Sequence, residues 1–215
     1  MNDGAERSSI VVQRPATALD ELVLLFHGVG ASADDLVPLA QRVAQARPHA
    51  FVASIGAPFP FGMGAGRQWF SVLGVTEQDR PARVAAAMPA FAGAVAHWQA
   101  ESGVDAARTT LIGFSQGAIM ALESTQAELP QPLARRVVAI AGRFAQPVRC
   151  APAGVALHLI HGAVDPVIPA QQSVQAVGAL RQLGAADTTL DVLPGLGHGV
   201  DGRVVDLVLS HLDAA

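Results

Sequence analysis

The chain has 215 residues and a mass of 22.1 kDa, and it is 51% hydrophobic but only 15% charged. A chain of this kind can bury about 70% of the surface of its unfolded form, which excludes intrinsic disorder and predicts one α/β domain. The formal net charge is −4, and all 14 basic residues are arginines scattered along the sequence. Since nucleic-acid binding requires concentrated positive charge, we expect no nucleic-acid partner.

The amino-terminal residues 1–10 carry acidic and basic side chains where a secretory signal peptide has an apolar segment. No run of about 18 apolar residues occurs, so we expect no stable membrane insertion. Cys150 is the only cysteine, which excludes an internal disulfide, and the Cys and His spacings typical of structural zinc are absent. We therefore expect a cytoplasmic protein without a metal.

Apolar runs of strand length alternate with longer segments of helical periodicity, a pattern typical of a mostly parallel sheet covered by helices on both faces. Continuous rather than alternating apolar runs indicate strands buried on both faces. Five such runs predict inner strands at residues 22–26, 51–55, 110–114, 137–141 and 155–160. Outer strands are expected at Ile10–Gln13 and residues 189–193.

Capping-box spacing marks the beginnings of two helices, at Ser32 with Asp35 and at Thr76 with Asp79. The second helix is the longest and repeats apolar residues every three or four positions: Val84, Met88, Phe91, Val95 and Trp98. Pro89 lies inside this pattern, so we expect a kink there. A final helix is predicted to bury one face, formed by Val204, Val205, Val208, Leu209 and Leu212.

Residues 56–75 form the one long irregular stretch, rich in glycine and proline. A connection of this length usually walls or covers a functional site. It contains Trp69 and Phe70, which we interpret as substrate-binding residues that line a pocket. The alternative is that the two rings form a small core under the loop.

The sequence around Ser115 predicts a nucleophile elbow, a tight turn that joins a strand to a helix. The segment reads Gly113-Phe114-Ser115-Gln116-Gly117, after a predicted strand and before a helical pattern. In such a turn the serine Oγ projects above the sheet, and the glycines permit close approach of strand and helix. The helix dipole also favours negative charge at this point. Ser115 is therefore predicted to be a catalytic nucleophile.

A serine hydroxyl is a poor nucleophile unless a nearby base takes its proton, so a histidine and an orienting carboxylate are required. Asp165 lies just after the predicted strand 155–160, and His198 lies in a glycine-rich loop after the outer strand. Both positions are at the carboxyl edge of the sheet, where Ser115 lies. The order Ser115, Asp165, His198 is the one that elbow serines of this kind use.

Other histidines and aspartates have simpler interpretations. His158 falls within an apolar strand and fits a core residue, and His161 fits a loop-shaping hydrogen bond better than proton transfer. Asp191 falls inside a strand, and Asp201 fits the amino terminus of the last helix. Asp187 remains a rival carboxylate without a clear role.

Acyl transfer also needs donors for a tetrahedral oxyanion. After strand 22–26 the chain reads His27-Gly28-Val29-Gly30, where small residues allow backbone amides to point into a site. We predict that the oxyanion hole is formed by the amides of Val29 and of Gln116, the residue after the nucleophile.

With these residues assembled, the chain resembles the phospholipase/carboxylesterase family of α/β-hydrolases, which includes acyl-protein thioesterases and small bacterial carboxylesterases. The resemblance spans nearly the whole chain and is carried by five segments: residues 25–30, 67–70, 113–117, 161–169 and 197–198. Glutamine after the nucleophile, together with Arg67-Gln68-Trp69-Phe70, is more specific than the elbow. Two positions depart from the family pattern, because Ala31 and Ser71 stand where many members have aspartate.

The resemblance implies a serine carboxylesterase that needs no cofactor and hydrolyses carboxylic esters of small molecules. We predict a single α/β-hydrolase domain over residues 1–215. No insertion other than residues 56–75 is long enough to form a separate lid domain, so we expect a shallow pocket that prefers short to medium acyl esters. Thioesters and lysophospholipids are alternative substrates for the same triad. A binding protein on a hydrolase scaffold is the competing hypothesis from another class, and a complete triad argues against it. The sequence does not predict an oligomeric state.

Overall fold

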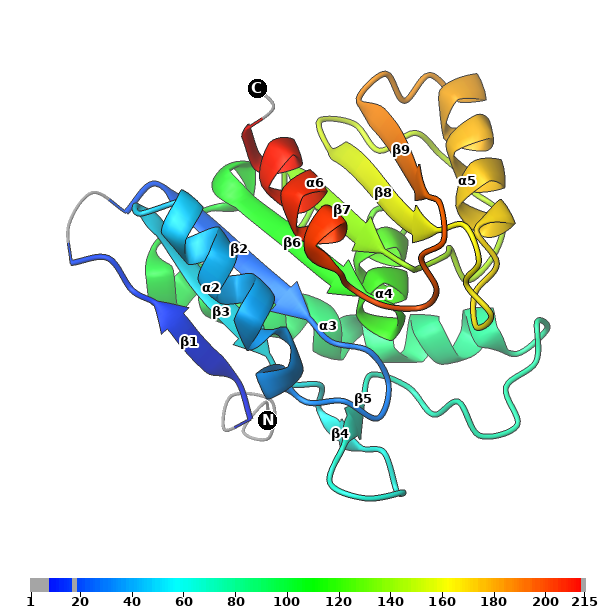
Figure 1. The fold of residues 1–215 in the computed structure, drawn as a ribbon, viewed down its shortest axis with the longest axis horizontal. Coiled ribbons are helices and arrows are strands. Elements are labelled where there is room, and N and C mark those ends of the chain that lie inside the picture. Colours follow the sequence, from blue (N-terminus) through cyan, green and yellow to red (C-terminus); the bar gives the residue numbers. More distant parts are fainter. Residues whose placement is uncertain (1–7, 17–18, 214–215) are drawn as a thin grey trace.

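The computed structural model describes residues 8–16 and 19–213, and a seven-stranded twisted sheet runs through its centre (Figure 1). The strands of this sheet are β1 (Ile10–Gln13), β2 (Glu21–Phe26), β3 (Ala50–Ile55), β6 (Thr109–Phe114), β7 (Arg136–Ile140), β8 (Ala156–Gly162) and β9 (Thr188–Leu193). Their order across the sheet is β1-β3-β2-β6-β7-β8-β9. Only β1 pairs antiparallel, with β3, and every other neighbouring pair is parallel.

Helices cover both faces of the sheet, as predicted. On one face lie α3 (Arg80–Ser102), α4 (Gln116–Ser124) and α5 (Gln171–Gln182), and on the other lie α2 (Val37–Ala46) and α6 (Gly202–Asp213). Figure 1 shows α2 and α6 in front of the sheet, with α3 and α4 behind it. Each face has its own hydrophobic cluster, because the inner strands point alternate side chains to opposite sides. Because β2, β3 and β6 to β9 run parallel, their carboxyl ends share one edge of the sheet. The loops that carry Ser115 and Asp165 begin at this edge.

Helix beginnings follow the predicted capping residues. The Thr76 amide donates to Asp79 Oδ1 at 2.7 Å, and the Asp79 amide donates to Thr76 Oγ1 at 3.2 Å, just before α3. The Ser32 amide donates to Asp35 Oδ2 at 2.7 Å, but the first turn there is a 3-10 helix, Ala33–Leu36. The longest helix continues through Pro89 from Arg80 to Ser102 without interruption.

Four elements differ from the sequence-based expectation. The helix α5 was not predicted, because its buried side chains include the polar Ser173 and the small Ala176. The irregular stretch contains a small antiparallel pair, β4 (Phe59–Pro60) and β5 (Arg67–Gln68). The strand β8 extends to Gly162, so His161 lies at the end of the strand rather than in the following loop.

The last helix packs through three of the five predicted positions. Val204, Val208 and Leu212 are buried, whereas Val205 and Leu209 are partly buried at the margin of the same cluster. No helix within residues 8–16 and 19–213 combines the length and the apolar character that crossing a bilayer requires.

Candidate active site

Ser115 lies in a strained turn between β6 and α4. Its φ is 53° and its ψ is −114°, a backbone conformation that residues with a side chain rarely adopt. The glycines on either side permit the close packing that the turn needs. A Cβ at Gly117 would lie 2.1 Å from the Phe26 carbonyl oxygen, and one at Gly113 would lie 2.5 Å from the Ala118 Cα. The sequence Gly-x-Ser-x-Gly thus has a direct steric reason here.

The structure brings Ser115, His198 and Asp165 together in a hydrogen-bonded chain. Ser115 Oγ lies 2.9 Å from His198 Nε2, and His198 Nδ1 lies 2.7 Å from Asp165 Oδ2. Because a carboxylate only accepts, His198 Nδ1 carries a proton that it donates to Asp165. The other ring nitrogen, Nε2, then accepts from the Ser115 hydroxyl, so the imidazole is placed to take the serine proton.

Asp165 is held as a carboxylate by its neighbours. Its side chain is fully buried, and this desolvation by itself would raise the pKa. Hydrogen bonds from His198 and from the amides of Ile168 (3.0 Å) and Val167 (2.8 Å) outweigh the burial, so the pKa lies below its usual value. One carboxylate oxygen therefore orients the imidazole, while the other is fixed by the backbone.

The rival histidine His161 contacts Asp165 but does not reach Ser115 by any hydrogen bond in the described residues. His161 Nε2 lies 2.8 Å from the Ile168 carbonyl oxygen and 3.3 Å from Asp165 Oδ2, and Nδ1 lies 2.7 Å from Ser173 Oγ. Since a carbonyl only accepts, Nε2 is the protonated nitrogen. His161 thus holds the loop around Asp165, as the sequence predicted.

The other rivals lie elsewhere. His158 stacks on His211, with 4.2 Å between ring centroids, and His211 Nε2 lies 2.8 Å from Asp191 Oδ2. Asp201 accepts from the Val204 amide at 3.1 Å, which confirms the prediction that it begins the last helix. None of these side chains joins the chain of contacts from Ser115.

The loop that follows β2 passes close to Ser115 and is fixed by its backbone. A Cβ at Gly28 would lie 3.2 Å from the Ser115 Cβ. The Gly30 amide donates to the Arg67 carbonyl at 2.9 Å, and the Arg67 amide donates to the Ala31 carbonyl at 2.8 Å. The Arg67 side chain in turn binds the carbonyl oxygens of Ala57 and, at 2.7 Å, Pro58. The irregular stretch therefore supports the loop that carries Val29.

His27 fixes the same loop from inside the protein. Its Nδ1 lies 2.7 Å from the Gly28 carbonyl oxygen, and its Nε2 accepts from the Ala57 amide at 3.1 Å. Both contacts require the neutral tautomer with the proton on Nδ1. Burial lowers the pKa of His27, so this tautomer is stable near neutral pH.

Sequence reasoning missed the role of the Gln116 side chain. Its Oε1 accepts from the Trp69 amide at 2.8 Å, and its Nε2 donates to the Phe70 carbonyl at 2.8 Å. The side chain is buried, so these two bonds link the first turn of α4 to the Trp69-Phe70 backbone. The joint occurrence of Gln116 with the Arg-Gln-Trp-Phe segment is the signal that could have revealed this link.

A cavity of about 540 Å³ opens beside Ser115. Its walls come from the Val29 loop, the Phe70 segment, the first turns of α4, the loop after Asp165 and the beginning of α3. The residues that line it are Val29, Phe70, Val72, Glu77, Arg80, Ser115, Gln116, Ile119, Arg143, Val167, Ile168, Pro169 and Gln172. Val29 and Gln116 thus face the same space as Ser115.

Trp69 and Phe70 have different environments. Phe70 lines the cavity beside Ser115, although its ring is largely buried. Trp69 is not among the residues that line this cavity. It is fully buried, with ring centroids 5.1 Å from Phe91 and 5.8 Å from Phe26. The packing of Trp69 therefore follows the alternative of a core residue under the loop.

Comparison with known proteins finds hydrolases. The sequence model of the phospholipase/carboxylesterase family matches residues 7–215. Esterase YpfH of Escherichia coli (strain K12) is 48% identical over 202 residues, which cover 94% of this chain and 86% of the relative. The chain belongs to the phospholipase/carboxylesterase family. It is a hydrolase.

Solved structures of similar fold include esterases. The crystal structure of esterase PE8 has a TM-score of 0.85 and 29% identity, and the match covers 95% of this chain and 97% of that one. A carboxylesterase from Mesorhizobium loti has a TM-score of 0.75 and 23% identity, over 91% of this chain and 90% of that one. At this identity the second likeness shows the fold alone.

The two departures from the family pattern lie in backbone turns. Ala31 contributes its carbonyl to the Arg67 amide, and Ser71 accepts a hydrogen bond from Arg83 through its carbonyl at 2.8 Å. Ser71 Oγ also accepts from the Leu73 amide at 3.3 Å. Both turns are therefore held by hydrogen bonds in which at least one partner is a backbone group.

Proposed function

We propose that the protein is a serine carboxylesterase that hydrolyses short to medium acyl esters through an acyl-enzyme intermediate. The observation that carries the proposal is the chain of contacts from Ser115 through His198 to Asp165, at 2.9 and 2.7 Å. These distances lie within hydrogen-bond reach, which a nucleophile and its base require.

In the first half of the proposed reaction, His198 Nε2 takes the Ser115 proton as Oγ attacks the ester carbonyl. The imidazolium that forms is stabilised by Asp165, which stays ionised because its pKa is lowered. His198 then donates the proton to the departing alcohol oxygen, and the acyl group remains on Ser115. Water completes the reaction when His198 takes its proton and returns it to Ser115 Oγ.

The oxyanion of each tetrahedral intermediate is assigned to the amides of Val29 and Gln116. Gln116 is the first residue of α4, so its amide has no partner within the helix. Val29 faces the same cavity from a loop that His27 and Arg67 hold in place. Donors that are fixed before the reaction stabilise developing charge without a reorganisation cost.

The cavity walls favour an acyl chain over a polar group near the reacting carbon. Phe70, Ile119, Val167 and Ile168 contribute apolar surface beside Ser115. Each buried methylene contributes about 0.8 kcal/mol at most, so affinity is expected to rise with acyl length until the cavity is filled. The restricted volume supports a preference for short to medium chains.

The proposal is tested by labelling and by mutation. We expect a fluorophosphonate probe to modify Ser115, and Ser115→Ala to lower kcat on 4-nitrophenyl butyrate by about 10⁴- to 10⁶-fold with the fold intact. His198→Ala is expected to cause comparable damage. Ser210→Ala and His49→Ala, which change exposed residues of the same types, serve as controls. More than a tenth of the wild-type activity in Ser115→Ala would refute the assignment.

A further inference from the structure

A second cavity, of about 570 Å³, adjoins the one beside Ser115. The two cavities share three lining residues: Glu77, Arg143 and Gln172. Beyond these, the second cavity is lined mainly by apolar groups between the β7–β8 loop, α5 and the start of α3. They include Pro81, Phe144, Ala145, Val148, Ala176 and Ala179.

The shared residues include an ion pair with two contacts. Arg143 donates to Glu77 through both terminal nitrogens, at 2.7 and 3.1 Å, and Arg80 adds a third bond to Glu77 at 2.9 Å. The hydrogen bonds from Arg143 and then Arg80 lower the pKa of Glu77, so this carboxylate is ionised at neutral pH. Since both cavities contact Glu77 and Arg143, the pair lies where they meet.

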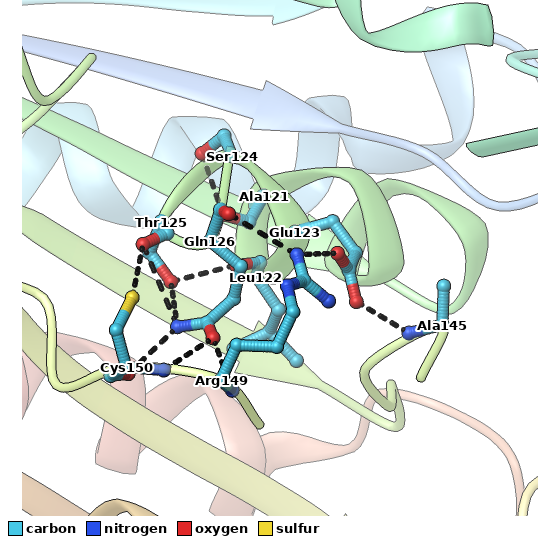
Figure 2. A network of polar contacts seen from close by, with 9 residues as sticks. All are labelled: Ala121, Leu122, Glu123, Ser124, Thr125, Gln126, Ala145, Arg149 and Cys150. Atoms are coloured by element: carbon cyan, nitrogen blue, oxygen red, sulfur yellow. Dashed lines mark hydrogen bonds and ion pairs between the residues drawn. The ribbon is translucent and has the colours of Figure 1, made fainter. Parts of the chain in front are cut away.

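One wall of the second cavity is fixed by hydrogen bonds to buried side chains. Glu123, buried near the end of α4, accepts from the Ala145 amide at 2.7 Å and from Arg149 at 3.0 Å. Gln126 accepts from the amides of Arg149 (2.8 Å) and Cys150 (3.1 Å). Figure 2 shows this network joining the end of α4 to the segment that follows Arg143. A wall fixed by such bonds keeps its shape when the cavity is empty.

We propose that the Glu77–Arg143 ion pair closes the Ser115 cavity towards the second cavity and so limits the acyl-chain length that the wild-type enzyme accepts, and that the second cavity takes the distal part of a long acyl chain once the pair is broken. The proposal rests on the esterase function proposed above. Its physical basis is simple. An apolar chain that leaves the Ser115 cavity in this direction meets two charged side chains, and truncation of either side chain would open a passage between the two cavities.

The test measures kcat/KM on 4-nitrophenyl esters from acetate to dodecanoate, each below its solubility limit. We expect wild type to decline beyond medium lengths. Arg143→Ala and Glu77→Ala should each raise the dodecanoate-to-butyrate ratio at least tenfold, since each newly buried methylene contributes up to about fourfold. Arg143→Lys, which retains a charge pair, should raise it much less. Glu77 is 62% exposed, so its removal leaves the fold intact.

Two further variants distinguish an acyl chain that enters the second cavity from a general loosening of the active site. Arg108→Ala removes an exposed arginine of the Arg108–Asp105 pair, before β6 and away from both cavities, and should leave the ratio unchanged. Ala179→Phe fills the second cavity from α5. In the Arg143→Ala background it should return the ratio to the wild-type value.

The outcomes are distinguishable. If butyrate hydrolysis depends on Ser115 but the ratio stays flat in both Arg143→Ala and Glu77→Ala, the subsite proposal is wrong and the esterase function stands. A gain that survives Ala179→Phe also overturns the subsite, because the chain then lies elsewhere. If no variant shows Ser115-dependent hydrolysis, the proposed function itself fails.

Discussion

Trp69 and Phe70 are adjacent in sequence, but their backbone is held by Gln116 so that the two rings point into different environments. Phe70 reaches the cavity beside Ser115, and Trp69 packs on Phe26 and Phe91. Aromatic residues in a loop carry no periodicity, so the sequence could not separate a cavity wall from a core.

The two rings should differ in how their removal affects acyl selectivity. We expect Phe70→Ala to lower kcat/KM on octanoate about three- to tenfold more than on acetate, because only the longer chain loses buried contact. Phe70→Leu should restore most of the loss. Trp69→Ala is expected to destabilise the protein by about 3–5 kcal/mol and to lower both activities equally. An equal change in selectivity for both alanine variants would place Trp69 against the acyl chain.

The three residues assigned to the triad could be predicted from sequence because topology constrains them. Ser115 follows the central strand β6, whereas Asp165 follows β8 and His198 follows β9; because these strands are parallel, their loops meet at the same end of the sheet. The role of the Gln116 side chain could not be predicted in this way. Its partners are the Trp69 amide and the Phe70 carbonyl, and any residue type offers such backbone groups, so only the joint occurrence of Gln116 with the Arg-Gln-Trp-Phe segment hints at the link.

At the scale of elements, buried strands and long helices could be predicted because many residues contribute to each pattern. The helix α5 could not, since the face that it buries combines Ser173 and Ala176 with Val177 and Leu180. Ser173 is buried because it binds His161, a tertiary contact that polarity alone argues against. Boundaries shifted by one or two residues, as at β8, where pairing with β9 continues through Gly162.

The elbow depends on close packing of α4 against β2, which glycine substitutions can test. Gly117→Ala places a Cβ 2.1 Å from the Phe26 carbonyl oxygen, and a backbone atom in a central strand cannot move aside cheaply. We expect a loss of about 3 kcal/mol in the free energy of unfolding. Activity should also fall, because Phe26 leads directly into the loop that carries Gly28 and Val29.

Gly178 provides the matched control for this substitution. It lies inside α5, and a Cβ there would meet nothing within 4 Å. Gly178→Ala should stabilise the protein by about 0.5–1 kcal/mol, because alanine loses less backbone entropy in a helix. Urea unfolding of both variants measures the difference. A similar, small effect for the two substitutions would mean that the elbow tolerates a wider spacing.

For the molecule as a whole, the buried histidines of the described residues lie in two places. One is the edge that carries Ser115. The other lies between β8, β9 and α6, where His158 contacts Thr189 at 2.9 Å and stacks on His211. Arg136 and Asp191 also act on His158 electrostatically. Sequence could predict that His158 is buried, but its pairing with His211 follows from the packing of α6 on the sheet.

This second group should make stability depend on pH. Burial, followed by the repulsion of His211 and Arg136, lowers the pKa of His158 from 6.5 to about 4. The unfolded chain therefore binds a proton between pH 6.5 and 4 that the folded protein refuses, and stability falls as pH falls through this window. The full effect is about 3 kcal/mol. His27, whose pKa is also lowered, acts in the same direction.

Urea unfolding at pH 7 and pH 5 measures this effect above the range where Asp and Glu usually titrate. We expect wild type to be less stable at pH 5, and His158→Asn to lose less stability between the two pH values. Asparagine keeps a polar atom near the position of Nδ1, and hence the contact with Thr189, but it does not titrate. His49→Asn changes an exposed histidine and should retain the wild-type slope. If His158→Asn and wild type lose equal stability between pH 7 and 5, His158 is not the group that couples folding to protonation.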